Sequence, residues 1–167
     1  MSARKPQLAL RLEAATPDRD VPWGAGSSIV YLGATLTLTL DTAHRMPTLI
    51  GKELHLPLPP AATPRQMRDA AESWLRDEAL RIFQKSALSE GLDVTPTRQK
   101  SALAGRRPAR VVLAFGKRGD WAKHDGDVLR CHWRLIEQPP AIIEQVLGRA
   151  LAAMRPEPVC GDLFALA

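Results

Sequence analysis

The sequence predicts an α+β fold, in which a mixed or antiparallel sheet carries one long helix and a C-terminal helix packed on it. Three observations support this class. Residues 34–40 alternate strictly between apolar and polar side chains, apolar residues recur at helical spacing after Thr63, and the same spacing returns after Pro140. A chain of 167 residues fits one domain. We therefore expect a single domain over 1–167, with 1–27 as a poorly patterned N-terminal segment.

Residues 28–31 and 34–40 predict two strands joined by a turn at Leu32-Gly33, because Leu36, Leu38 and Leu40 alternate with threonines. Residues 53–58 alternate again, and Pro57 indicates an edge or a strand end. Residues 110–115 and 128–135 predict two further strands. In the last of these, one face is expected to carry Leu129, Cys131, Trp133 and Leu135, and the other Val128, Arg130, His132 and Arg134.

Two helices complete the prediction. The first begins at Thr63, where Thr63, Pro64 and Gln66 form a capping-box signature, and ends near Gly91. The second runs from about Pro140 to Met154. Its expected core stripe consists of Ile143, Val146, Leu147, Ala150, Leu151 and Met154. We expect loops at 95–109, which is basic, and at 116–127, which is rich in glycine.

Composition excludes several classes of protein. Hydrophobic residues make up 45% and charged residues 25% of the chain, which is ordinary for a globular protein and unlike disordered, collagen-like or coiled-coil chains. Two cysteines exclude a disulfide framework and a four-cysteine zinc module. Without an apolar run of about 18 residues or a signal peptide, we expect no membrane association and a cytoplasmic location.

The basic charge is concentrated in one part of the chain. Arg98 to Arg134 holds ten Lys or Arg residues and three Asp, a net charge of +7, whereas the remainder is close to neutral. Such a segment attracts nucleic acid or acidic surfaces. No aromatic ladder or nucleic-acid motif accompanies it, which favours a solvated surface. An association with nucleic acid stays as an alternative.

Leu129–Leu135 reads L-R-C-H-W-R-L, and Pro139-Pro140 then precedes the last helix. This segment resembles the YgjP-like zinc metallopeptidases, small relatives of the SprT and minigluzincin-type proteases. Gly33 fits the family's L-G step, and Trp74 fits its first helix. The resemblance covers roughly residues 25–155 and implies that the last helix is equivalent to the H-E-x-x-H helix that binds zinc.

The residues at the motif positions differ from the family pattern. Arg149 stands at the first zinc histidine, Ala150 at the catalytic glutamate and Ala153 at the second histidine. The family's third histidine has no counterpart in 155–164, and its R-W-G-S-C loop is replaced around 120–124. Alanine cannot bind a metal and arginine stays cationic. We therefore expect no catalytic residues, no metal site and no cofactor, although zinc serves the related active family.

Other metal-ligating or nucleophilic residues do not show a recognisable spacing. The candidates are His44, His55, His124, His132, Cys131 and Cys160. No pair has helical i, i+4 or C-x-x-C spacing, and Cys131 and His132 face opposite ways on a strand. A rebuilt zinc site and a Cys or Ser nucleophile are therefore not predicted.

The remaining binding candidates are Arg130, His132 and Arg134. They suggest a peptide or an acidic protein partner, and an added strand is one mode by which an extended peptide binds. The alternative is salt bridges to Glu137 or Glu144. The function that fits best is a catalytically degenerate YgjP-like domain retained for binding or regulation. Two alternatives stay open: an active zinc metallopeptidase with unrecognised ligands, and a nucleic-acid-associated basic protein.

Overall fold

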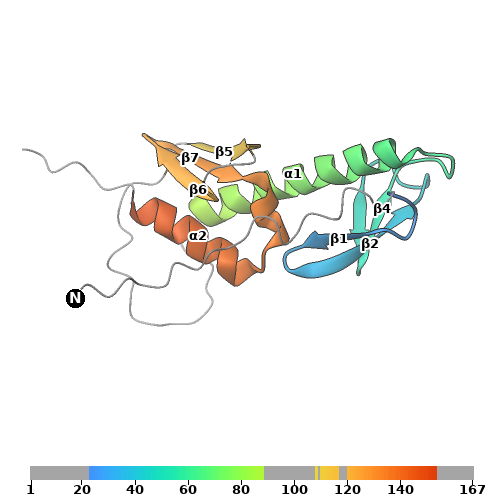
Figure 1. Ribbon diagram of the computed structural model, residues 1–167, viewed down its shortest axis with the longest axis horizontal. Coiled ribbons are helices and arrows are strands. Elements are labelled where there is room, and N and C mark those ends of the chain that lie inside the picture. Colours follow the sequence, from blue (N-terminus) through green and yellow to red (C-terminus); the bar gives the residue numbers. More distant parts are fainter. Residues whose placement is uncertain (1–22, 89–107, 109, 117–119, 154–167) are drawn as a thin grey trace, which may run out of the picture.

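The computed structural model describes residues 23–88, 108, 110–116 and 120–153, which form two sheets and two α-helices (Figure 1). The α+β class predicted from the sequence is confirmed. Expectations for the N-terminal segment before Trp23, for most of the basic loop at 95–109 and for the tail at 154–167 lie outside the described residues. No helix among the described residues is both long and apolar enough to cross a membrane.

Sheet A contains four strands in the order β1-β2-β4-β3. Its strands are β1 (Ser28–Tyr31), β2 (Ala34–Leu40), β3 (Thr48–Ile50) and β4 (Glu53–Leu56). The predicted turn between β1 and β2 is confirmed, with φ of 50° at Leu32 and 77° at Gly33, which gives a tight hairpin. β4 runs parallel to β2 and ends directly before Pro57, as expected for a residue that lacks an N–H. The short edge strand β3 was not predicted.

Sheet B contains three strands in the order β5-β7-β6, with β7 parallel to β5 and antiparallel to β6. Its strands are β5 (Arg110–Ala114), β6 (Ala122–Asp125) and β7 (Val128–His132). The expectation of a loop throughout 116–127 is therefore wrong, because β6 lies within it.

The prediction of a strand up to Leu135 is also wrong. β7 ends at His132, and Trp133–Glu137 forms a 3-10 helix, η2. Leu135 and Ile136 are consecutive and both fully buried. A strand would send one of them to the opposite face, whereas a helical turn places both against the core. The backbone N–H of Arg134 donates to Nδ1 of His132 at 3.3 Å, which helps this turn to begin.

The long helix α1 (Pro64–Leu88) runs along the molecule from sheet A to sheet B (Figure 1). The predicted capping box is confirmed: the N–H of Thr63 donates to Oε1 of Gln66 at 2.8 Å, and the N–H of Gln66 donates to Oγ1 of Thr63 at 3.3 Å. Its buried stripe consists of Met67, Ala71, Leu75, Ala79, Phe83 and Ala87.

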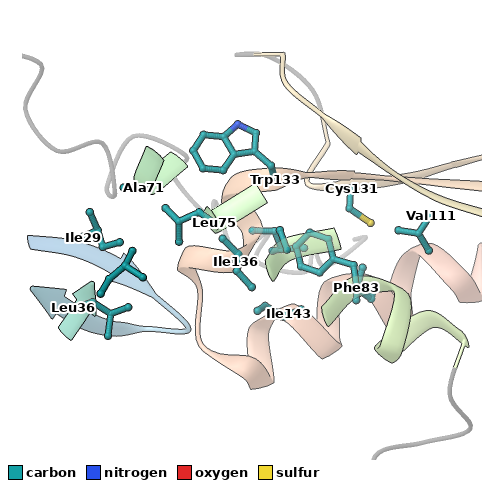
Figure 2. Packing of buried hydrophobic residues seen from close by; sticks show 14 of the residues in the cluster. Ile29, Leu36, Ala71, Leu75, Phe83, Val111, Cys131, Trp133, Ile136 and Ile143 are labelled. Carbon is teal, nitrogen blue, oxygen red and sulfur yellow. The ribbon is translucent and has the colours of Figure 1, made fainter. Parts of the chain in front are cut away.

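The helix α2 (Pro140–Ala152) buries Ile143, Leu147 and Ala150. Figure 2 shows Ile143 below Ile136 and Phe83, with Val111 and Cys131 of sheet B on the same side of the core. Ile29 and Leu36 of sheet A lie at the other end, beside Leu75 of α1. One continuous hydrophobic cluster therefore joins both sheets and both helices.

The β1–β2 turn is attached to the end of η2 and packs on the residue that precedes α2. The N–H of Leu32 donates to the carbonyl oxygen of Ile136 at 2.8 Å, and that of Gly33 to Glu137 at 3.0 Å. A Cβ atom added at Gly33 would lie 2.8 Å from Cγ of Pro139. Glycine is therefore required at this position both for its positive φ and for its close approach to Pro139.

Candidate functional site

The residues of α2 at the family's motif positions do not form a site. Arg149 is exposed, Ala150 is buried in the core and 8% exposed, and Ala153 is exposed at the C-terminal end of the helix. Residues 149 and 153 share one helix face, as two zinc histidines would, but neither has a metal-ligating atom. Ala150 packs as a small apolar residue, so this position contributes to stability.

Arg130, His132 and Arg134 do not form one exposed cationic face. Arg130 is exposed and lies 3.6 Å from Asp125. His132 is buried, its Nε2 donates to the carbonyl oxygen of Gly116 at 2.8 Å, and burial lowers the pKa of its imidazole, with Arg134 acting in the same direction. His132 is therefore a neutral histidine that closes the end of sheet B.

Arg134 belongs to η2 and covers Trp133. Its guanidinium lies 5.2 Å from the Trp133 ring centroid, and its Nε lies 4.0 Å from a carboxylate oxygen of Glu137. The structure thus places Arg134 beside Glu137, one of the two acidic residues that the alternative named. Addition of a peptide strand to β7 is excluded, because β7 lies between β5 and β6 and both of its edges are paired.

Two arginines lie close to the ring of Trp133. Arg76 of α1 also lies 5.2 Å from its ring centroid, and Nη2 of Arg76 donates to Oε2 of Glu72 at 2.6 Å. Next to this cluster, a cavity of about 30 Å³ is lined by Trp23, Ile29, Val30, Glu72, Leu75, Trp133, Arg134 and Glu137. Its volume suits one or two water molecules, whereas small-molecule sites are about ten times larger.

Burial strongly shifts the pKa values of two side chains, Glu137 and Cys131. Burial raises the pKa of Glu137 to about 7, against the opposing effect of Arg134 and with a further increase from Glu72. Burial also raises the pKa of the Cys131 thiol to about 12. A thiol of this kind is protonated at neutral pH, so Cys131 is not a nucleophile.

The sequence reasoning missed a cluster at the end of β2. Asp41, His44 and His55 bring their ligand atoms within 4.8 Å of one another, the one such group among the residues that the structure describes. Local spacing could not reveal it, because Asp41 and His55 are 14 positions apart and meet through the parallel pairing of β2 with β4. His44 and His55 are among the candidate ligands of the sequence analysis, whereas Asp41 is not.

Sheet B also has an exposed basic face that was not recognised. Arg110, Lys123 and Arg130 come from β5, β6 and β7, and all three are exposed. Lys123 pairs directly with Arg130, and Arg110 pairs with Val128, so the three side chains lie on one side of the sheet. Its other side is covered by α1 and α2 (Figure 1). We refer to Arg110, Lys123 and Arg130 as the basic face.

The chain matches no protein-family model, no curated protein and no solved structure. The resemblance to the YgjP-like metallopeptidases therefore rests on the sequence alone, most specifically on Leu129–Pro140.

Proposed function

We propose that this protein is a non-catalytic, YgjP-like domain that binds an acidic segment of a partner protein. The order of strand, proline turn and helix is the part of the chain that resembles the family. At the motif positions, Arg149, Ala150 and Ala153 offer neither a metal ligand nor a general base, which argues against the family's hydrolytic reaction.

The basic face is the observation that carries the binding proposal. Neighbouring strands lie about 4.8 Å apart, so the charges of Arg110, Lys123 and Arg130 are concentrated within a small area. Asp125 lies on the same side of the sheet, 3.6 Å from Arg130, and offsets part of this positive charge. An acidic chain complements this charge, and Arg130 offers a planar donor group that suits carboxylates.

An exposed aromatic side chain follows β5 on the side of sheet B that faces α1. Phe115 directly follows β5, and 60% of its surface is exposed. The guanidinium of Arg76 on α1 lies 5.8 Å from the ring centroid of Phe115, so Phe115 does not belong to the basic face.

The binding experiment uses a fluorescent Asp/Glu-rich peptide. Anisotropy should show saturable binding that weakens as salt rises, because exposed charges are screened. Lys123→Glu with Arg130→Glu should weaken binding at least tenfold. The control is Arg65→Glu with Arg68→Glu, which changes the net charge equally at two exposed positions of α1.

Three outcomes would contradict the binding proposal. The first is an absence of saturable binding, and the second is an equal loss in the two double variants. The third is a stronger response to an unlabelled oligonucleotide competitor than to an acidic peptide competitor, which would favour the nucleic-acid alternative.

A peptidase assay tests the non-catalytic part of the proposal. The full chain, with and without added Zn²⁺, should not hydrolyse casein. Hydrolysis that a chelator abolishes and Zn²⁺ restores would instead favour the alternative of an active metallopeptidase with unrecognised ligands. The proposal keeps a cytoplasmic location, which two cysteines in 167 residues favour.

A further inference from the structure

The backbone around the end of β2 directs three side chains to one point. Asp41 directly follows β2, and its N–H donates to the carbonyl oxygen of Leu56 at 2.9 Å, so it stays beside β4. Its Oδ1 accepts the N–H of Ala43 at 2.8 Å, which bends the chain and returns His44 toward Asp41. Oδ2 of Asp41 is then directed at both histidines.

The separations of these atoms fit a metal site. Oδ2 of Asp41 lies 3.0 Å from Nδ1 of His55 and 3.6 Å from Nε2 of His44. In a tetrahedral site with metal–ligand bonds of about 2.1 Å, two ligand atoms lie about 3.4 Å apart. The two distances bracket this value, and all three ligand atoms lie within 4.8 Å of one another, so side-chain rotations that replace the present hydrogen bond between Asp41 and His55 would let them hold an ion.

A second, independent feature orients His55. The nitrogen that faces away from Asp41, Nε2, lies 3.5 Å from Oε2 of Glu53, and Oγ1 of Thr39 donates to the same carboxylate oxygen at 3.4 Å. Metal-binding histidines commonly donate their other N–H to a carboxylate that is itself hydrogen-bonded. Glu53 and Thr39 supply this arrangement from β4 and β2.

We propose that Asp41, His44 and His55 bind one divalent metal ion such as Zn²⁺ or Co²⁺. Two imidazoles and one carboxylate suit zinc and its neighbours, whereas calcium and magnesium require mostly oxygen ligands. The side chain of His55 is 16% exposed and that of His44 is 36% exposed, so water can reach the ion and complete its coordination.

This site is separate from the helix that the family resemblance singles out. Asp41, His44 and His55 belong to sheet A, whereas the motif positions lie on α2, which packs against α1 and β6. The inference therefore goes beyond the proposed function and does not depend on it. Bound metal would fix residues 41–44 to β4, near the exposed edge strand β3.

The experiment titrates the full chain with Zn²⁺ by calorimetry and with Co²⁺ by visible absorption. We expect one equivalent of each ion, with the intense visible bands of low-coordinate Co²⁺. His44→Ala should weaken binding at least tenfold. Glu53→Gln should weaken it about 10–100-fold, because it removes the carboxylate beside His55. The matched control, His124→Ala on β6, should bind both ions as the unaltered chain does.

Thermal unfolding separates loss of a ligand from loss of the fold. His44 lies in the loop after β2, so His44→Ala should melt like the unaltered chain without metal. Zn²⁺ should raise the melting temperature of the unaltered chain and of the His124→Ala control by more than that of His44→Ala. Absence of a bound equivalent, or equal affinity in His44→Ala and the unaltered chain, would overturn the proposal. Binding of the acidic peptide should be the same in His44→Ala, so failure of one proposal leaves the other testable.

Discussion

Glu137 is a buried side chain whose ionisation reduces the stability of the folded protein. It is 7% exposed, with Arg134 of η2 and Glu72 of α1 as its charged neighbours. Arg134 approaches it only to 4.0 Å, so burial outweighs the attraction and the neutral carboxyl group is favoured. The backbone carbonyl oxygen of Glu137 also accepts the N–H of Gly33, so this buried carboxyl group belongs to a residue that holds the β1–β2 turn of sheet A.

Glu137→Gln should therefore stabilise the protein increasingly as pH rises. The pKa of Glu137 is about 7 in the folded protein and 4.5 for an ordinary glutamate, so ionisation penalises folding progressively between these values. The full difference corresponds to roughly 3 kcal/mol. Melting temperatures from pH 4.5 to 8 measure the gap between variant and unaltered chain. The exposed Glu144→Gln serves as the control, and a gap that does not change with pH would contradict the assignment.

Gly33→Ala should destabilise the protein more than Gly51→Ala. Both glycines have a positive φ, 77° and 60°, so both changes carry a backbone cost of roughly 1–2 kcal/mol. Only Gly33 has Pro139 within contact distance, whereas a Cβ atom at Gly51 meets nothing within 4 Å. Urea unfolding of the two variants isolates the contribution of this contact, and equal losses would show that the turn is not closely packed on Pro139.

At the scale of the elements, periodicity predicted the strands and helices that bury one face against the core. The alternation in β2 and the apolar stripe of α1 both reflect packing on one side, and both are confirmed. Two features could not be read in this way. η2 buries consecutive residues, which interrupts the alternation of β7, and β6 is too short and polar to give a strand pattern.

α2 illustrates how packing opposes the introduction of an H-E-x-x-H motif. Arg149→His with Ala153→His changes two exposed positions and should leave stability nearly unchanged. Ala150→Glu should destabilise the protein by several kcal/mol, because it places a carboxylate at a buried position. We expect the triple variant, made together with His44→Ala, to bind zinc weakly and to lack peptidase activity. Thermal melts, a zinc titration and a casein assay measure this, and strong activity would contradict it.

Leu147→Ala should cost roughly 2–5 kcal/mol, because Leu147 is 2% exposed and fills the core between α2 and its neighbours. Leu151→Ala is the matched control, since Leu151 lies on the same helix and is only half-buried. Urea denaturation gives both losses. A Leu147→Ala loss no larger than that of the control would show that this face of α2 is not packed on the core.

For the whole molecule, the limit of sequence reasoning lies in long-range pairing. Asp41 meets His55 because β2 and β4 are parallel neighbours, and the basic face exists because β7 lies between β5 and β6. Neither strand order follows from local patterns, since the same strands could pair in several ways. The sequence therefore yielded the fold class and most elements, but neither of the two surfaces on which the proposals rest.

The continuous core predicts that both sheets unfold together. α1 contacts β4 of sheet A and β5 of sheet B, and the buried residues form one cluster. Far-ultraviolet circular dichroism and tryptophan fluorescence should therefore give coincident urea transitions. Separate midpoints would show that the two sheets are independent units.

The burial of Cys131 has a practical consequence. With a thiol pKa of about 12, a fraction of about one in ten thousand is thiolate at pH 8, and the sulfur is covered by the core. In a Cys160→Ser chain, a thiol reagent can modify Cys131 only when sheet B opens. The rate at which the Cys131 sulfur is modified then measures how often sheet B opens, without the use of denaturant. A substitution elsewhere in the chain that raises this modification rate must make opening of the centre of sheet B more frequent.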